Sequence, residues 1–375
     1  MKTRVSMAAA SALLALTALV AGCGGSSDDN SGPHATTTIA VPNSASPPFN
    51  FDIGWADSGK YYLADRSNAS VDVVDTKSNT LVAQIKGGFA GIGASSDTSG
   101  PDGLVGIPGT STLYVGDVNS VKVMDVSAQK VVKTIPISTS GLRVDEGCYD
   151  ADDNIVMFAS PGETPPFASF ISTKTQAVVA KLSFTGSSGL EACVYDPKSK
   201  NFLINNDGTS ANPDGEVDVI PASSVVAGTP AITRVFPLGK CSPAGIDLGP
   251  NNDMIVGCDP SAGNPLITLI LDRTSGATLA TIPFGGVDQI AYDSASNRYF
   301  LPARHYQTSK VAASSGFVPT LGIVDAGSRS IVTTMAIGNN SHSVAVDGGT
   351  GQAYLPFAPG VAAFPNGGIL VVTTH

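Results

Sequence analysis

Seven short segments of the sequence end in a similar turn, and six of them carry an acidic residue or a histidine five residues before that turn. The segments are FDIGWAD, PDGLVGI, VDEGCYD, LEACVYD, PAGIDLG, VDQIAYD and SHSVAVD. The residues at the shared position are Asp52, Asp102, Asp145, Glu191, Ala244, Asp288 and His342. If the segments are equivalent strands around one axis, these side chains gather in one place. Clustered carboxylates repel one another and need a cation, shared protons or hydrogen-bond donors.

Two chemistries fit this position. A hard divalent ion such as Ca²⁺ prefers oxygen ligands, so the candidate metal ligands are Asp52, Asp102, Asp145, Glu191 and Asp288. In a catalytic site, His342 and His305 are the candidate proton carriers. The alternative is structural, because an aspartate at the start of a strand often accepts backbone N–H bonds from the adjoining loop.

A second set of polar residues begins the long loops after the second strand of several segments. Loops on a rigid scaffold are where binding and catalysis concentrate, so we treat five of these residues as candidate ligand-binding groups. They are Asp65, Asp117, Asp207, Arg304 and His305. The alternative for any one of them is a solvated residue at the rim.

The strands that must position these residues recur with a fixed pattern. The clearest copy has YYLAD at 61–65, VDVVD at 71–75 and LVAQI at 81–85, and the next has LYVGD at 113–117, VKVMD at 121–125 and VVKTI at 131–135. Alternating apolar and polar residues are typical of half-buried strands. These copies resemble the YVTN-type β-propeller repeat. Seven copies from residue 51 onward give a period of about 46 residues, which fits four strands per blade.

The last copy lacks a fourth strand, and a spare apolar segment, TTTIAV, lies at residues 36–41. We expect this segment to supply the missing outer strand, which would close the ring and remove exposed sheet edges. The predicted fold is therefore an all-β, seven-bladed β-propeller of four-stranded antiparallel blades, closed by the N-terminal strand.

Composition agrees with this fold and excludes some functions. Only 14% of the residues are charged, while the chain has 41 glycines and 25 prolines, as short strands with many turns require. The formal net charge of -10 argues against nucleic-acid binding. We expect a monomer.

The first residues predict an export signal and an anchor. Lys2 and Arg4 precede an apolar run at residues 7–20, and the sequence VAGC that ends at Cys23 resembles the bacterial lipobox. We therefore assign residues 1–22 to a lipoprotein signal peptide, 23–35 to the lipidated cysteine and a flexible tether, and 36–375 to the propeller. The predicted location is the cell envelope, on the periplasmic face of the outer membrane or the cell surface. The only expected membrane contact is the lipid anchor.

The remaining four cysteines divide into two expectations. Cys241 and Cys258 flank a predicted hairpin with its turn at residues 249–252, so we predict a disulfide between them. Cys148 and Cys193 lie one position out of phase on neighbouring inner strands. We expect their side chains to leave opposite faces and to remain buried free thiols.

Two functions remain open. The first is a binding protein that holds a small polar ligand, a cation or a protein partner on its loop-rich face. The second is a metal-dependent hydrolase, because some propellers that resemble this one are Ca²⁺-dependent lactonases and esterases. This ring is richer in Asp and poorer in Asn than theirs. No haem or nucleotide motif occurs, so a divalent cation, preferably Ca²⁺, is the only cofactor we expect.

Overall fold

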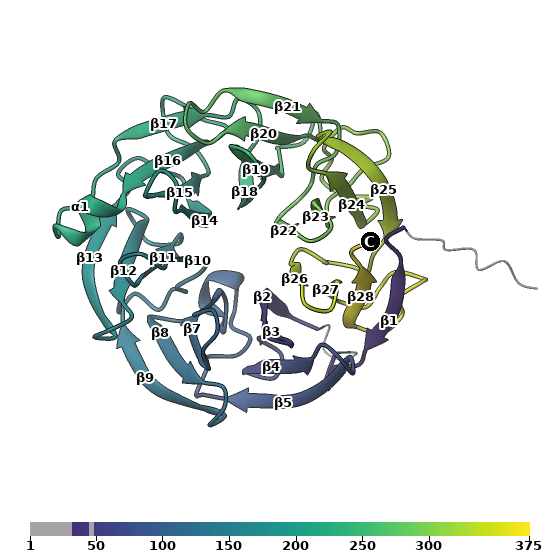
Figure 1. Ribbon diagram of the computed structural model, residues 1–375, viewed down its shortest axis with the longest axis horizontal. Helices are drawn as coiled ribbons and strands as arrows, with labels where there is room; N and C mark the ends of the chain where they lie inside the picture. Colours follow the sequence, from purple (N-terminus) through teal and green to yellow (C-terminus); the bar gives the residue numbers. More distant parts are fainter. Residues whose placement is uncertain (1–31, 45–48) are drawn as a thin grey trace, which may run out of the picture. The chain divides into compact units, whose positions relative to one another are not determined.

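The computed structural model describes residues 32–44 and 49–375, and nearly all of these residues lie in strands or in the turns between them. Seven four-stranded antiparallel sheets stand around a central channel as the blades of a β-propeller (Figure 1). The sequence therefore predicted the fold class correctly. The described helices are short: the 3₁₀ helix η1 (Ser96–Thr98) precedes the second blade, and α1 (Ala222–Val226) lies outside the ring.

The blades follow one another along the chain, each built from the innermost strand outward. Blades one to three contain β2 (Phe51–Asp57), β3 (Lys60–Asp65), β4 (Ser70–Asp75) and β5 (Thr80–Lys86); β6 (Leu104–Gly106), β7 (Thr112–Asp117), β8 (Ser120–Asp125) and β9 (Lys130–Pro136); and β10 (Gly147–Asp150), β11 (Ile155–Ser160), β12 (Phe167–Ser172) and β13 (Ala177–Ser183).

The remaining four blades repeat this order. They contain β14 (Leu190–Asp196), β15 (Asn201–Asn206), β16 (Glu216–Pro221) and β17 (Arg234–Pro237); β18 (Pro243–Leu248), β19 (Asp253–Cys258), β20 (Thr268–Asp272) and β21 (Thr278–Ile282); β22 (Ala291–Asp293), β23 (Arg298–Ala303), β24 (Thr320–Asp325) and β25 (Ser330–Ala336); and β26 (Ala345–Asp347), β27 (Gln352–Phe357) and β28 (Gly368–Thr373).

The seventh blade takes its outer strand from the other end of the chain. Strand β1 (Ala35–Ile39) pairs antiparallel with β28, with Ile39 opposite Ile369. Ile39 is buried in the cluster that joins the last blade to the first. The ring is thus closed by the N-terminal strand, as the spare segment at residues 36–41 predicted.

In four blades an aspartate ends the third strand and folds the turn that follows it: Asp75, Asp125, Asp272 and Asp325. Oδ1 of Asp75 accepts hydrogen bonds from the backbone N–H groups of Lys77 and Ser78 at 3.1 and 3.0 Å. Asn79 then adopts a φ of 52°, in the left-handed region that asparagine tolerates. Asp125 makes the equivalent bonds in the second blade. The repeated aspartate is therefore a local turn former.

Apolar side chains pack between neighbouring blades rather than in one central core. In four blades a tyrosine near the start of the second strand is fully buried: Tyr61, Tyr114, Tyr299 and Tyr354. The rings of Tyr61 and Tyr354 stack with their centroids 4.9 Å apart, across the contact between the first and last blades. This packing fixes the angle between blades and hence the geometry of the channel.

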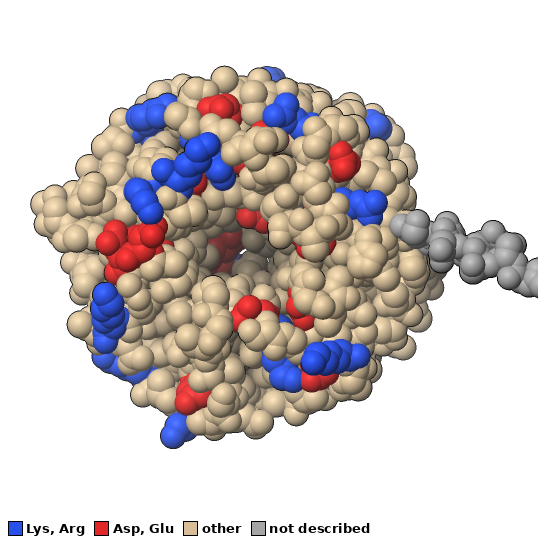
Figure 2. All heavy atoms as spheres, viewed as in Figure 1, with Lys and Arg blue, Asp and Glu red and all other residues tan. Residues whose placement is uncertain are grey.

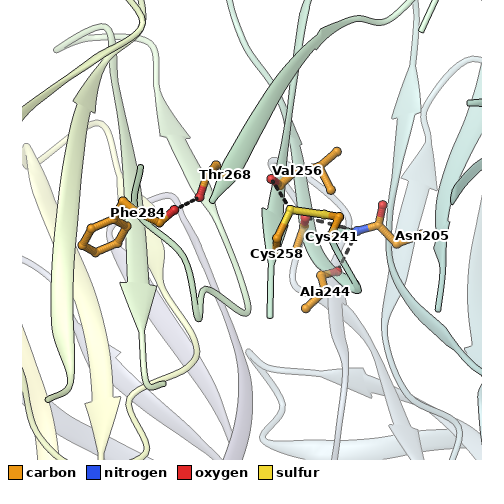
Figure 3. Close-up of a disulfide and its surroundings, with 8 residues drawn as sticks. Asn205, Cys241, Ala244, Val256, Cys258, Thr268 and Phe284 are labelled. Atoms are coloured by element: carbon orange, nitrogen blue, oxygen red, sulfur yellow. Dashed lines mark hydrogen bonds between the residues drawn. A yellow bond between two sulfur atoms is a disulfide. The ribbon is translucent and has the colours of Figure 1, made fainter. Parts of the chain in front are cut away.

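The predicted disulfide between Cys241 and Cys258 is confirmed, and it joins the segment before β18 to the end of β19 (Figure 3). In the same view, the side-chain amide of Asn205 donates to the carbonyl oxygen of Ala244 at 2.8 Å. This bond ties the fourth blade to the start of the fifth.

The expectation of free thiols at Cys148 and Cys193 is wrong, because these residues form a second disulfide. The two cysteines belong to different sheets that stack face to face. When two sheets stack face to face, the upper face of one packs against the lower face of the other. Side chains that leave opposite faces of their own sheets therefore meet at the shared interface, and a difference of one position along the strands brings them together. Cys148 pairs across its sheet with Met157 and Cys193 with Ile204, and both pairs lie in one interblade cluster.

Cys23 and the predicted signal peptide lie outside the described residues. Within residues 32–44 and 49–375, no helix has the length and apolar character needed to cross a membrane.

Candidate functional site at the channel mouth

A cavity of about 220 Å³ opens where the inner strands begin. Figure 2 shows acidic side chains around the central hollow of the molecule. The cavity is lined by Asn50, Phe51, Asp52, Ile53, Arg66, Ser96, Arg143, Asp145, Glu146, Glu191, Asp288, Arg304, Asn340 and His342. Some of these residues come from the segments that enter an inner strand and others from the loops after a second strand. Both kinds of loop therefore meet on one face.

The structure divides the acidic residues of the mouth into two clusters. Asp52, Asp102 and Asp145 form one of them, and each offers one carboxylate oxygen that lies within 4.8 Å of one from each of the other two. We call this group the arginine-bridged cluster, because Arg66 and Arg143 neutralise it. Nη2 of Arg66 lies 2.7 Å from Oδ2 of Asp52, and Nε of Arg66 lies 3.0 Å from Oδ1 of Asp102.

Arg143 completes this cluster from the third blade. Its Nη2 lies 2.9 Å from Oδ2 of Asp145, and its Nε lies 3.3 Å from Oδ1 of Asp97 beside the cavity. Burial raises the pKa of Asp145 to about 7, although Arg143 opposes the shift. Burial also disfavours ionised Asp52, yet Arg66, His342 and Arg143 together hold the pKa of Asp52 below its usual range. Two guanidinium groups thus already supply positive charge to these three carboxylates.

His342 belongs to the same side of the mouth. Its Nε2 lies 3.3 Å from Oδ1 of Asp52, and its Nδ1 lies 2.8 Å from the carbonyl oxygen of Asn340. The imidazole also stacks on Phe51, with ring centroids 5.0 Å apart. Because both ring nitrogens have partners, this histidine is held in one orientation.

Glu146, Glu191 and Asp288 form the second group, which we call the open cluster. Again each residue offers one carboxylate oxygen that lies within 4.8 Å of one from each of the other two. Asp288 pairs with Nη2 of Arg304 at 2.8 Å. Among the described residues, no lysine or arginine forms a salt bridge with Glu146 or Glu191. The open cluster therefore contains three carboxylates, and one guanidinium group pairs with them.

The environment of the open cluster disfavours ionisation. Burial, reinforced by the negative charge of Glu191, Asp145 and Asp288, raises the pKa of Glu146 well above its usual value. Burial and neighbouring carboxylates do the same for Glu191. Nε2 of Gln289 donates a hydrogen bond to Oε1 of Glu146 at 2.5 Å, which partly offsets this shift. Beyond that bond, a retained proton or a cation would relieve the repulsion among these carboxylates. Ca²⁺ takes oxygen ligands at about 2.4 Å, so ligand atoms on opposite sides of the ion are about 4.8 Å apart. The spacing of the open cluster is compatible with that geometry.

A second cavity of about 270 Å³ adjoins the first and shares Glu191, Asp288 and Arg304 with it. Asp207 and Asp259 also line it, and burial raises the pKa of Asp207 to about 6. Nδ1 of His305 lies 2.7 Å from Oδ2 of Asp259. Of the predicted loop residues, Asp207 and Arg304 thus line a cavity, and His305 contacts a residue that does.

The other two predicted loop residues, Asp65 and Asp117, line neither cavity. Asp65 is buried and accepts hydrogen bonds from the backbone and side-chain nitrogens of Asn68 at 2.9 and 2.6 Å. Oδ1 of Asp117 accepts the backbone N–H of Ala90 at 3.1 Å, and Oδ2 lies 3.3 Å from Nζ of Lys122. Both carboxylates hold loops and strands together.

Arg143 and Glu146 are site residues that the sequence-based predictions do not include. Alignment on the turns placed only Asp145 at the repeated position, yet the chain reads RVDE over residues 143–146. Three charged residues in four are unusual in a protein with 14% charged residues. That local concentration was the available signal for both residues.

No protein-family model matches the sequence, and no curated protein matches it. Solved structures do resemble the fold. A hydrazine synthase structure from Kuenenia stuttgartiensis has a TM-score of 0.66 at 15% identity, over 88% of this chain and 96% of that chain. A chain in the crystal structure of a mitotic checkpoint complex has a TM-score of 0.62 at 13% identity, over 96% of this chain and 98% of that chain. At these identities the likeness concerns the seven-bladed fold alone.

Proposed function

We propose that this protein is a binding module of the cell envelope that takes a divalent cation, preferably Ca²⁺, into the open cluster at its channel mouth. A small polar ligand or a protein partner on the loop-rich face would then contact the bound ion or the two cavities beside it. The propeller fold is consistent with ligand or protein binding, since such scaffolds present their loops on a rigid frame.

The observation that carries the proposal is the unequal neutralisation of the two acidic clusters. The arginine-bridged cluster has two guanidinium groups for three carboxylates. The open cluster has Arg304 alone, so three negative charges against one positive leave a formal charge of -2 when all are ionised. One divalent cation would balance that charge. Carboxylate oxygens are also the ligands that Ca²⁺ prefers.

Calorimetric titration of the protein with Ca²⁺, and separately with Zn²⁺, tests the proposal. We expect Ca²⁺ to bind with a Kd of about 10⁻⁴–10⁻³ M or tighter, in the range of extracellular calcium modules. Glu191→Gln removes one anionic ligand and should weaken binding about tenfold or more.

Glu163→Gln is the matched control, because it makes the same chemical change in a loop residue outside both cavities. This variant should bind Ca²⁺ as the unaltered protein does. Absence of binding at millimolar metal, or equal loss in both variants, would exclude the open cluster as the site.

We further propose that the mature protein is anchored by lipid at Cys23, on the periplasmic face of the outer membrane or the cell surface. The lipobox-like sequence is the main support. Two disulfides among the described residues agree with an oxidising compartment. Mass spectrometry of the N-terminal peptide from membranes tests the anchor, and an unmodified Cys23 would refute it.

A metal-dependent hydrolase is the second candidate, favoured by the pair of His305 and Asp259. A carboxylate that holds one imidazole nitrogen leaves the other free to act as a general base. Lactones and aryl esters should then be hydrolysed only with Ca²⁺, and both Glu191→Gln and His305→Ala should abolish the activity. Activity unaffected by either change would remove this mechanism.

A further inference from the structure

The disulfide between Cys148 and Cys193 lies next to the open cluster along two strands. Cys148 follows Glu146 by two residues at the start of β10, and Cys193 follows Glu191 by two residues in β14. These are the innermost strands of the third and fourth blades. The bond therefore joins covalently the two strands that present both glutamates of the cluster.

The two glutamates differ in how firmly the backbone holds them. The carbonyl oxygen of Glu146 accepts the N–H of Ala159 at 2.9 Å, which ties it to the neighbouring strand β11. In β14, by contrast, pairing with β15 is irregular between Leu190 and Cys193. Glu191 lies inside that irregular stretch, so the sheet fixes its position less well than it fixes that of Glu146.

We infer that the Cys148–Cys193 disulfide is a positioning element for the open cluster, because it sets the separation of the Glu146 and Glu191 carboxylates. The inference rests on the proposed cation binding for its functional consequence. A cation site holds its ion tightly only when its ligands are preorganised. The site is then fully formed only in a compartment where the disulfide persists, so cation binding depends on oxidation of this cysteine pair.

The second disulfide supplies a matched control within the chain. Cys241 and Cys258 are joined inside the fifth blade, and no residue of that blade belongs to the open cluster. Removing either disulfide takes away one covalent cross-link. Only one of the two links strands that carry the cluster carboxylates.

The experiment compares Cys148→Ala/Cys193→Ala with Cys241→Ala/Cys258→Ala in the full chain, by calorimetric titration with Ca²⁺ below the melting transition of each variant. We expect the first variant to bind about tenfold more weakly, the effect typical of losing support around a metal ligand. The second should bind as the unaltered protein does. Equal affinity in all three proteins, or equal loss in both variants, would overturn the inference.

A second readout does not require cation binding. The chain has glutamates only at 146, 163, 191 and 216, so ¹³C labelling of glutamate gives four carboxyl signals. Loss of the Cys148–Cys193 bond should shift or broaden the signals of Glu146 and Glu191 and leave those of Glu163 and Glu216 in place. The control variant should change neither cluster signal. If the unaltered protein binds no cation, the proposed function fails, and these spectra alone decide whether the disulfide positions the glutamates.

Discussion

Nη2 of Arg304 lies 2.8 Å from Oδ2 of Asp288, and this is the one salt bridge that the described residues make to the open cluster. The side chain of Arg304 is 28% exposed, and the guanidinium group lies between the two cavities that both include it. Arg304 therefore competes with any cation for Asp288 while it reduces the repulsion among the carboxylates. Its removal should have opposite effects on cation binding and on the stability of the cation-free protein.

Arg304→Gln should tighten Ca²⁺ binding about fivefold, because a positive charge beside the site is lost and Asp288 becomes a free ligand. The same change should lower the free energy of unfolding without cation by about 1–3 kcal/mol, since a largely desolvated carboxylate loses its partner. Calorimetry and denaturant unfolding measure the two effects. Arg329→Gln is the control, because it breaks an arginine–aspartate pair outside both cavities and should not alter Ca²⁺ affinity.

The stability of the cation-free protein should rise as the pH falls from 8 to 5. Burial raises the pKa of Asp145 to about 7, and those of Asp207, Asp218 and Asp247 to about 6. Each group binds its proton more tightly in the folded than in the unfolded chain. Its contribution to stability is therefore full near pH 4 and is lost as the pH rises through the folded pKa. Thermal unfolding followed by circular dichroism should give a Tm several degrees higher at pH 5 than at pH 8.

Two further measurements test the same pKa shifts. Ca²⁺ should raise Tm more at pH 8 than at pH 5, because the raised pKa values of Glu146 and Glu191 keep these ligands protonated in acid. Well below pH 4 the trend should reverse, since the depressed pKa of Asp52 means that protonation there breaks its pairing with Arg66. A Tm that falls steadily from pH 8 to pH 5 would contradict the assignment of raised pKa values.

The fold could be predicted from the sequence because its determinants are local and repeated. The aspartate turn, the left-handed residue after it and the alternating strands all act within a few residues of one another. The position of β1 could also be predicted, since the last repeat lacked a fourth strand and a spare apolar segment lay before the first repeat. The Cys148–Cys193 bond was missed because its geometry depends on how two sheets face each other.

The site was predictable only in outline, for the same reason. A position shared by the repeats indicated that acidic residues gather at the mouth. Their division into two clusters depends on long side chains that cross between blades, such as Arg66, which reaches Asp102 at the entry to the next blade. Aligning the strands does not show which carboxylate the guanidinium group of a long arginine side chain will reach. The distinction between neutralised and open carboxylates therefore needs the structure.

Arg66 should be a major determinant of stability. It is 5% exposed, and it pairs with Asp52 and Asp102, which are 6% and 0% exposed. Arg66→Met would leave buried Asp102 without its partner and Asp52 with only His342 and the more distant Arg143, and should cost about 3–5 kcal/mol. Adding Asp102→Asn should recover part of that loss, because the unpaired charge of Asp102 disappears.

Lys60→Met serves as the comparison for Arg66→Met. Lys60 pairs with Asp75, but the two side chains are 37% and 27% exposed. An exposed pair of this kind contributes little to stability, because solvent screens it. Chemical denaturation of the variants measures each cost, and a similar small loss in Arg66→Met and Lys60→Met would show that the arginine-bridged cluster is not an important source of stability.

Closure of the ring by β1 should make unfolding cooperative around the whole propeller. Ile39 is 5% exposed and packs among residues of the last and first blades. Ile39→Ala should cost about 2–5 kcal/mol, whereas Thr37→Ala, at an exposed position of the same strand, should cost less than about 0.5 kcal/mol. Calorimetry should show one transition in both variants, because each blade interface supports the next. A separate early transition in Ile39→Ala would mean that the seventh blade detaches alone and that β1 holds only its own sheet.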